Sequence, residues 1–200
     1  MRILLVRHGR ASAESAYDVD LVYPDPVLSD LGVSQAEKLG QRLLAHRIEA
    51  IYSSDLKRAV ETAKIVAQYT NTDIIIKPQF REINMGAIFT QGWEAFPDFY
   101  EQWRRHEADL PYPRGEAGID VVTRAWPVLD EIMQQYNHDV VIVTHGGVIM
   151  SLLSACLGME LEKRFRFVPP ANCSVSVLFC DRTDGYIRVE KVNDTAHLDS

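Results

Sequence analysis

Residues 1–10 read MRILLVRHGR, and this stretch decides both the fold and the site that we expect. Residues 3–6 are a short run of mostly branched apolar side chains, which predicts a strand buried on both faces. The run stops at Arg7-His8-Gly9, because a cation and an imidazole cannot continue a core, and Gly9 lets the backbone turn sharply and approach a ligand closely. Ligands bind at the carboxyl ends of strands in open α/β sheets, so we interpret His8 as a nucleophile and Arg7 as an anion clamp beside it. The alternative at this point is a surface loop that contains the two side chains by chance.

A second strand with the same kind of ending lies in the C-terminal third of the chain. Residues 139–144 contain four consecutive branched side chains and are followed by HGG at residues 145–147 and a helical pattern over 148–157. His145 therefore lies at a strand's carboxyl end and at a helix N-terminus, where the two glycines leave backbone N–H groups free to face an anion. Two buried strands that both end in His-Gly rarely arise by chance, so His145 supports the interpretation of His8.

Between and around these two strands, the chain alternates strands and helices. Ser29 is a good N-cap for the first helix, and Pro127 should kink or divide a later one. The predicted helices start near residues 30, 54, 120 and 148, and further strands are predicted at 50–53, 73–77, 174–180 and 186–192, the last two as a hairpin at one sheet edge. This order predicts a three-layer α/β/α sandwich around a mostly parallel sheet. We interpret residues 1–200 as a single domain with a lid-like insertion at about 87–114.

Two further side chains are candidates for the site. Arg58 falls in the first turn of its predicted helix, where the helix dipole disfavours a cation unless an anion binds there. The alternative is an exposed Arg58 that pairs with Glu61 or Asp55. Glu82 follows a predicted strand in a segment that ends in a glycine turn, and it could serve as a general acid. A solvated Glu82, or one paired with Arg81, is the alternative.

The predicted insertion combines aromatic and basic side chains. Aromatic residues at 96, 99, 100 and 103 have helical spacing and predict a short amphipathic helix, with Arg104, Arg105 and His106 close behind. A lid could use the aromatic side chains to exclude water and the basic ones to hold substrate. Such a stripe is more often simply part of the core, and both interpretations stay open.

Composition narrows the classes of partner. The chain has 21 basic and 28 acidic residues, a net charge of −7, which argues against a nucleic-acid partner. Three cysteines at no metal-like spacing favour a reducing compartment. The N-terminal apolar run is too short for a signal peptide, and the apolar stretch 140–157 is interrupted by THGG, which argues against a membrane span. We therefore expect a cytoplasmic protein without a membrane partner.

Three motifs together resemble the histidine phosphatase superfamily, the phosphoglycerate-mutase-like proteins. They are LVRHG at residues 5–9, SSDLKRA at 53–59 and VTHGG at 143–147. Two weaker stretches also match, residues 28–44 with Gly32 and Gln35-Ala36, and GEA at 115–117 leading into 120–124. The match runs in the family's order along nearly the whole chain.

The resemblance implies a covalent phosphohistidine mechanism. His8 would attack the phosphoryl group, and Arg7, Arg58 and His145 would hold its non-bridging oxygens. Glu82 would protonate the departing alkoxide and then activate the water that hydrolyses the phosphoenzyme. The resemblance implies no cofactor, and no metal is needed because these cationic and donor side chains take the place of a metal ion.

The chain departs from the family pattern directly after Gly9. Arg10-Ala11-Ser12 stands where many relatives have an acid and a hydroxyl side chain, followed shortly by Asn. Arg10 could compensate as an extra substrate-binding contact to the anion, and an ordinary surface arginine is the alternative. We expect substrate preference to depend on Arg10, on residues 12–25 and on the insertion.

These features predict a phosphoric monoester hydrolase of the histidine acid phosphatase type, which releases phosphate from a small phosphorylated metabolite. The alternative is a phosphoglycerate mutase, although the chain is short for the cofactor-dependent mutases and lacks their Trp-Asn pair and Tyr-Gly-rich stretch. A third hypothesis is a non-catalytic module that docks phosphorylated ligands, against which the intact His8 and Glu82 argue. A protein-phosphohistidine phosphatase is also conceivable, but those relatives are smaller and generally lack the segment that carries Glu82. The predicted edge hairpin could pair with a second copy to form a homodimer or be solvated.

Overall fold

A mixed sheet of six strands forms the centre of the computed structural model, which describes residues 1–12, 24–181, 183 and 185–199. The strand order is β3-β2-β4-β1-β5-β6. The first four strands in this order are parallel, and β5 and β6 form an antiparallel hairpin at one edge, as predicted. The strands are β1 (Arg2–Arg7), β2 (Ile48–Ser53), β3 (Ile74–Ile76), β4 (Asp139–Thr144), β5 (Val175–Cys180) and β6 (Ile187–Asp194).

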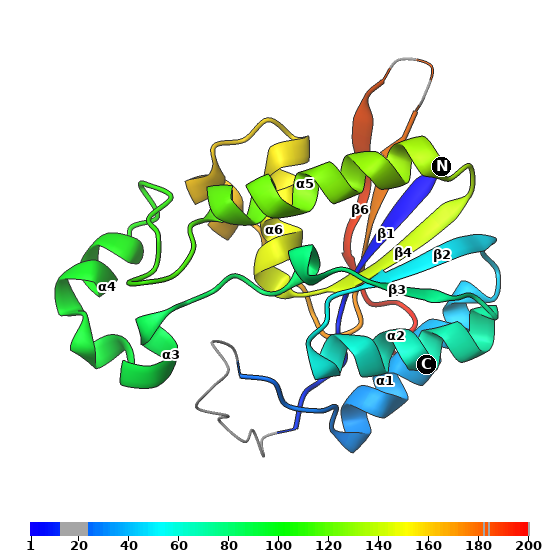
Figure 1. Ribbon diagram of the computed structural model, residues 1–200, viewed down its shortest axis with the longest axis horizontal. Helices are drawn as coiled ribbons and strands as arrows, with labels where there is room; N and C mark the ends of the chain where they lie inside the picture. The colour runs from blue at the N-terminus through cyan, green and yellow to red at the C-terminus, as the bar shows by residue number, and fades with distance from the viewer. Residues whose placement is uncertain (13–23, 182, 184, 200) are drawn as a thin grey trace.

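Helices cover both faces of the sheet, which confirms the predicted α/β/α sandwich (Figure 1). Helices α1 (Asp30–Leu43) and α2 (Lys57–Thr70) lie on one face, and α5 (Gly118–Gln135) and α6 (Gly146–Cys156) lie on the other. In β1, Ile3 and Leu5 pack into the core on the α5 and α6 side, whereas Leu4 and Val6 pack against α1 and α2. This alternation is the period of two that a strand imposes, and it confirms that β1 is buried on both faces.

The register of the parallel strands brings their carboxyl ends together. Arg7 of β1 lies opposite Thr144 of β4, and Ser53 of β2 lies opposite Val143 of the same strand. The next residues continue this ladder, since the His8 N–H donates to Thr144 O at 3.0 Å. Side chains that follow β1, β2 and β4 therefore meet at one edge of the sheet.

Two details of the helices test the sequence patterns. The Ser29 hydroxyl accepts a hydrogen bond from the Gly32 N–H at 3.2 Å, so Ser29 is the N-cap of α1, as predicted. Helix α5 continues through Pro127 from Gly118 to Gln135, so this proline does not divide the helix, and a kink at Pro127 stays a prediction. The described part of the chain contains no helix that is both long and apolar enough to cross a membrane.

The region predicted as an insertion extends beyond one end of the sheet (Figure 1). It contains α3 (Ala87–Gln91), η2 (Trp93–Ala95) and α4 (Pro97–Trp103); η1 (Pro78–Phe80) precedes it and η3 (Leu161–Arg166) lies later in the chain. Helix α4 is the predicted short amphipathic helix, and the side chains of Phe96, Phe99 and Trp103 are partly buried against the core. These contacts favour the core interpretation of the aromatic stripe, and the use of the region as a lid stays a prediction.

Candidate active site

His8 lies directly after β1 and is 6% exposed. Its Nδ1 is 2.7 Å from the carbonyl oxygen of Gly9, and its Nε2 is 3.1 Å from Nε of Arg58. Because an arginine can only donate, Nε2 must hold a lone pair, and the ring proton is on Nδ1, which donates to Gly9 O. The contacts of His8 thus select one neutral tautomer with an unprotonated Nε2.

The surroundings of His8 also keep the ring neutral. Burial, followed by the charge of Arg58, lowers the pKa of His8 to about 3, with a smaller contribution from Arg7 and against the opposing effect of the bond to Gly9. At neutral pH, the imidazole is therefore an uncharged base that faces cations.

Arg58 joins the two histidines. It is 9% exposed, and its Nη2 donates to Nδ1 of His145 at 3.3 Å while its Nη1 donates to Pro24 O at 2.8 Å. Burial lowers the pKa of Arg58, and the charges of Glu82 and Asp25 partly offset this. Every nitrogen of the guanidinium points at a neutral acceptor, an arrangement that leaves its charge available to an anion.

The alternative partners suggested for Arg58 are engaged elsewhere. Asp55 accepts two hydrogen bonds from Arg81, one of them at 2.6 Å from Nε. Glu61 accepts from the backbone N–H of Leu28 at 2.7 Å. The alternative of an exposed surface ion pair at Arg58 is therefore wrong, and Arg81 has Asp55 as a partner.

His145 lies directly after β4 and is fully buried. Because its Nδ1 accepts from Arg58, its proton is on Nε2, which donates to the hydroxyl oxygen of Ser54 at 2.9 Å. The ring centroids of His8 and His145 are 5.0 Å apart. Burial, and then the charges of His8 and Arg58, hold the pKa of His145 well below its usual value.

Arg7 supplies the second cation beside the histidines. Its Nη1 donates to Pro170 O at 2.6 Å, whereas its Nε is buried without a hydrogen-bond partner among the described residues. A Cβ placed on Gly146 would be 3.8 Å from this Nε, which puts the unpaired donor next to the first residue of α6. A buried donor without a partner costs about 1–3 kcal/mol, and an anion bound here would relieve that cost.

Glu82 is held against the residue that follows Gly146. Its Oε1 accepts from the N–H of Gly147 at 3.0 Å and from its own neighbour Ile83 at 2.9 Å. A Cβ on Gly147 would lie 2.6 Å from Oε1 and 2.8 Å from Cγ2 of Ile83, so a side chain here would displace the Glu82 carboxylate or Ile83. The N–H that was expected to face a bound anion thus faces the Glu82 carboxylate.

Arg10 is the one proposed site residue that lies outside this cluster. The residue is exposed, its N–H donates to Oε1 of Gln35 at 2.9 Å, and its carbonyl accepts from the Ser29 N–H at 2.9 Å. Within the described ranges, no contact joins its guanidinium to the histidines. The segment 13–23, part of the loop expected to set substrate preference, lies outside the described residues.

The structure adds residues that the sequence reasoning did not single out. Besides Ser54, Thr62 accepts the Gly9 N–H at 3.0 Å, and Asn172 donates from Nδ2 to His8 O at 3.0 Å. Thr62 lies one turn after Arg58 and could have been noticed as a polar residue within the apolar stripe of α2. Asn172 carries no such local signal, because only the tertiary structure brings it to His8.

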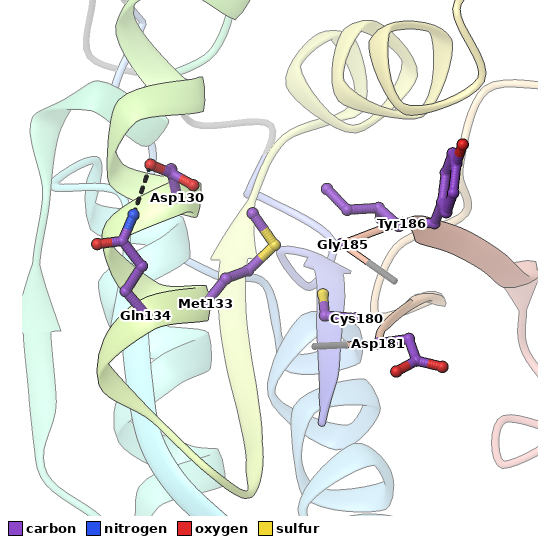
Figure 2. A pocket seen from close by; sticks show the side chains of 8 residues that line it. Asp130, Met133, Gln134, Cys180, Asp181, Gly185 and Tyr186 are labelled. Carbon is purple, nitrogen blue, oxygen red and sulfur yellow. Dashed lines mark hydrogen bonds between the residues drawn. The ribbon is translucent and has the colours of Figure 1, made fainter. Parts of the chain in front are cut away.

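Two further features of the described residues bear on sites elsewhere in the molecule. Among residues 1–12, 24–181, 183 and 185–199, no group of three or more His, Cys, Asp or Glu side chains is arranged to hold a metal ion. A pocket of about 410 Å³ lies between α5 and the β5–β6 hairpin, lined by residues that include Met133 and Cys180 (Figure 2). The Cys180 N–H donates to Met1 O, so this pocket lies at the amino end of β1, away from His8.

Comparisons with known proteins agree with the resemblance carried by the three motifs. Residues 3–195 match the model of the histidine phosphatase superfamily (branch 1). The probable phosphoglycerate mutase GpmB of Yersinia pestis is 30% identical over 210 aligned residues, which cover 100% of this chain and 95% of that protein. A mycobacterial glucosyl-3-phosphoglycerate phosphatase solved with inorganic phosphate has a TM-score of 0.82 and 25% identity, with 98% of each chain covered. Bacillus stearothermophilus YhfR has a TM-score of 0.80 and 28% identity, again with 98% of each chain covered.

Proposed function

Because the chain belongs to branch 1 of the histidine phosphatase superfamily, we propose that it is a metal-independent phosphatase that hydrolyses a small phosphorylated metabolite through a phosphohistidine on His8. The observation that carries the proposal is the tautomer of His8, with its Nδ1 proton held by Gly9 O and the lone pair of Nε2 facing Arg58. A neutral imidazole fixed in this way is a nucleophile at physiological pH.

In the first step, His8 Nε2 attacks phosphorus, a nitrogen–phosphorus bond forms, and the ester oxygen–phosphorus bond breaks. Arg58 would turn its donors from the two imidazoles to the non-bridging oxygens, and the unpaired Nε of Arg7 would find its acceptor there. Donors of this kind are each worth about 10²–10³ in rate when they face charge that develops in the transition state. His145 would join them once its ring proton has moved from Nε2 to Nδ1, with the Ser54 hydroxyl then donating to Nε2.

Glu82 would carry the proton in both steps. It would first give a proton to the departing oxygen, and its carboxylate would then take a proton from the water that attacks the phosphoenzyme. This second attack breaks the nitrogen–phosphorus bond, releases inorganic phosphate and restores neutral His8. The hydrogen bond from Gly147 supports the role, since it holds the carboxylate beside the loop that carries His145.

The names of the relatives point to two different reactions, hydrolysis of the phosphoenzyme and transfer of its phosphoryl group to a second hydroxyl. The mycobacterial structure, named for a phosphatase, favours hydrolysis, whereas the Yersinia relative, named a probable phosphoglycerate mutase, favours return of the phosphoryl group to a second hydroxyl. Both names contain a phosphoglycerate, so phosphorylated glycerates are the first substrates to test. We propose hydrolysis, because the site needs only water as its second substrate.

The test is phosphate release from p-nitrophenyl phosphate and from a panel of sugar and glycerate phosphates, with chelator present, beside an assay of 3- to 2-phosphoglycerate isomerisation. The proposal predicts phosphate release that survives chelation. Isomerisation without phosphate release would favour the mutase, and inactivity in both assays together with tight binding of phosphate would favour a docking module.

A further inference from the structure

Glu82 lies in a segment whose main chain is held by one side chain of a distant helix. Arg124, in the second turn of α5, donates from Nη2 to Glu82 O at 3.1 Å and from Nη1 to Gln79 O. The same guanidinium is bound to Glu116, with 2.8 Å between Nε and Oε1 and 3.0 Å between Nη2 and Oε2. Arg124 thus hydrogen-bonds the main chain at both ends of residues 79–82.

Glu116 holds the main chain on the other side of Glu82, at Asn84. Its Oε2 accepts from the Asn84 N–H at 2.9 Å, and its own backbone N–H donates to Asn84 O at 2.8 Å. The Arg124 and Glu116 side chains are 21% and 20% exposed, so water only partly competes with these bonds. From residue 79 to residue 84, one ion pair therefore holds the main chain at three positions.

Regular structure supports only the start of this segment, where η1 ends at Phe80 and the Phe80 carbonyl accepts from the Thr144 hydroxyl at 2.7 Å. Residues 81–85 belong to neither a helix nor a strand, whereas His8 and His145 follow strands of the sheet. The ion pair between Arg81 and Asp55 holds only the residue before Glu82. A general acid must lie within hydrogen-bond reach of the oxygen that it protonates, and a displacement of about 1 Å can cost about 10² in rate.

We propose that the pair of Arg124 and Glu116 positions Glu82 for proton transfer and does not contribute to phosphate binding. The inference rests on the proposed function, in which Glu82 is the general acid. It predicts that weakening the pair slows substrates with poor leaving groups, which need the proton, and spares those with good leaving groups. A purely structural role would slow both kinds equally.

The experiment compares Arg124→Lys, Arg124→Met and Glu116→Gln with Glu82→Gln and with the Glu82→Gln/Arg124→Met double variant. The measured quantity is kcat/KM for an alkyl phosphate divided by kcat/KM for p-nitrophenyl phosphate, with inhibition by inorganic phosphate as the probe of binding. We expect this ratio to fall about tenfold or more in the single variants, since general acids supply about 10²–10⁴. The inhibition constant for phosphate should stay within about twofold, and the double variant should have the same ratio as Glu82→Gln.

The chain offers a matched control in Arg42 of α1. Its ion pair with Asp194 has side-chain exposures of 20% and 19%, close to those of the proposed pair, and it bonds none of the candidate site residues. Arg42→Lys and Arg42→Met should lower thermal stability without changing the ratio. Should Arg124→Met fail to fold, Arg124→Lys and Glu116→Gln keep most of the side-chain volume and still test the prediction.

The outcomes separate this inference from the proposed function. Suppose that Glu82→Gln lowers the ratio. If the Arg124 and Glu116 variants then slow both substrates equally, or if the double variant has a lower ratio than Glu82→Gln, the positioning role is wrong and the proposed phosphatase activity is unaffected. If the wild-type protein releases no phosphate, or Glu82→Gln leaves the ratio unchanged, Glu82 is not the general acid of a phosphatase, and the positioning role is wrong as well.

Discussion

The two sides of the candidate site are built from different kinds of structure. On the side proposed to hold phosphate (the phosphate side), His8 and His145 are the first residues after two adjacent strands, and Arg58 is the second residue of α2. On the side proposed to protonate the leaving group (the leaving-group side), Glu82 lies outside helices and strands, and its carbonyl accepts from the side chain of Arg124. The phosphate side is thus fixed by the core itself, and the leaving-group side by polar contacts at its border.

This difference has a consequence for function. The main chain at the ends of buried strands can move only if the sheet moves, so the backbone that carries His8 and His145 has little freedom. The segment around Glu82 also leads into the region of residues 87–114, whose two ends are joined where the Ala87 N–H donates to Pro113 O at 2.8 Å. We therefore expect changes on the phosphate side to affect all substrates and changes on the leaving-group side to depend on the substrate.

Removal of the proposed nucleophile should have the largest effect. His8→Ala should lower kcat by at least about 10⁴ for aryl and alkyl phosphates alike, because no other group can form the intermediate. Equilibrium dialysis should still detect bound inorganic phosphate, since Arg7 and Arg58 remain. His46→Ala is the control, because His46 is partly exposed and bonds Asp139 at the amino end of β4. Turnover by His8→Ala within tenfold of wild type would contradict the assignment.

Loss of the second histidine should come next. His145→Ala should raise the inhibition constant of phosphate and lower kcat by about 10²–10³, again for every substrate. Ser54→Ala tests the support of this ring, because it removes the acceptor of the His145 Nε2 proton together with that of the Leu56 N–H, and it should give the same pattern with a smaller loss. Steady-state kinetics with phosphate as inhibitor measures both. A loss that depended on the leaving group would show that His145 acts on the leaving group and not on the phosphate.

Removal of the proposed acid should distinguish the two sides most clearly. Glu82→Gln should slow an alkyl phosphate by about 10² or more and p-nitrophenyl phosphate by less than about tenfold, because an aryl oxide leaves with little protonation. The slope of log kcat/KM against the leaving-group pKa, over a series of phenyl phosphates, measures the effect. Equal losses across the series would show that Glu82 is not the acid.

The pH dependence of the free energy of unfolding should be the smallest effect, and it should come from His8 and His145. The folded protein lowers the pKa of His8 to about 3, and that of His145 well below its usual value of 6.5, so the unfolded chain binds protons that the folded one does not. This stability is complete above about pH 6.5 and is lost as the pH falls toward 3, by up to ~1.4 kcal/mol per pH unit for each histidine. Urea unfolding at pH 7, 6 and 5 should give a shallower decrease for His8→Gln than for wild type, and an unchanged decrease for Arg124→Lys. Equal slopes for His8→Gln and wild type would contradict the buried neutral His8.

The sequence predicted that His8 and His145 lie together, because the signals at both positions are local. A buried strand that ends in His-Gly indicates where its last side chain lies, and the alternation of strands and helices predicts parallel strands, whose carboxyl ends share one edge of the sheet. Arg58 needed the resemblance to a family, since a surface ion pair was the simpler interpretation from the residues alone.

The contacts of Glu82 could not be predicted in this way. Its partners come from residues 42 and 65 positions further along the chain, Arg124 and Gly147, and no periodic pattern connects them. The same holds for Asn172, which reaches the His8 carbonyl across 164 positions. At Gly9, the expected close approach of a ligand is instead a close approach of α1, since a Cβ there would lie 2.5 Å from Gly32 O.

The most direct test of the account is a search for the covalent intermediate itself. Wild-type and Glu82→Gln proteins are mixed with a ³²P-labelled substrate from the panel, quenched in alkali, where phosphohistidine is stable, and mapped by peptide mass spectrometry. The account predicts label on the peptide that contains His8, more of it in Glu82→Gln because hydrolysis of the intermediate is slowed, and none in His8→Ala. Rapid phosphate release by the wild-type protein with no label on His8, or turnover by His8→Ala as fast as that of wild type, would contradict it.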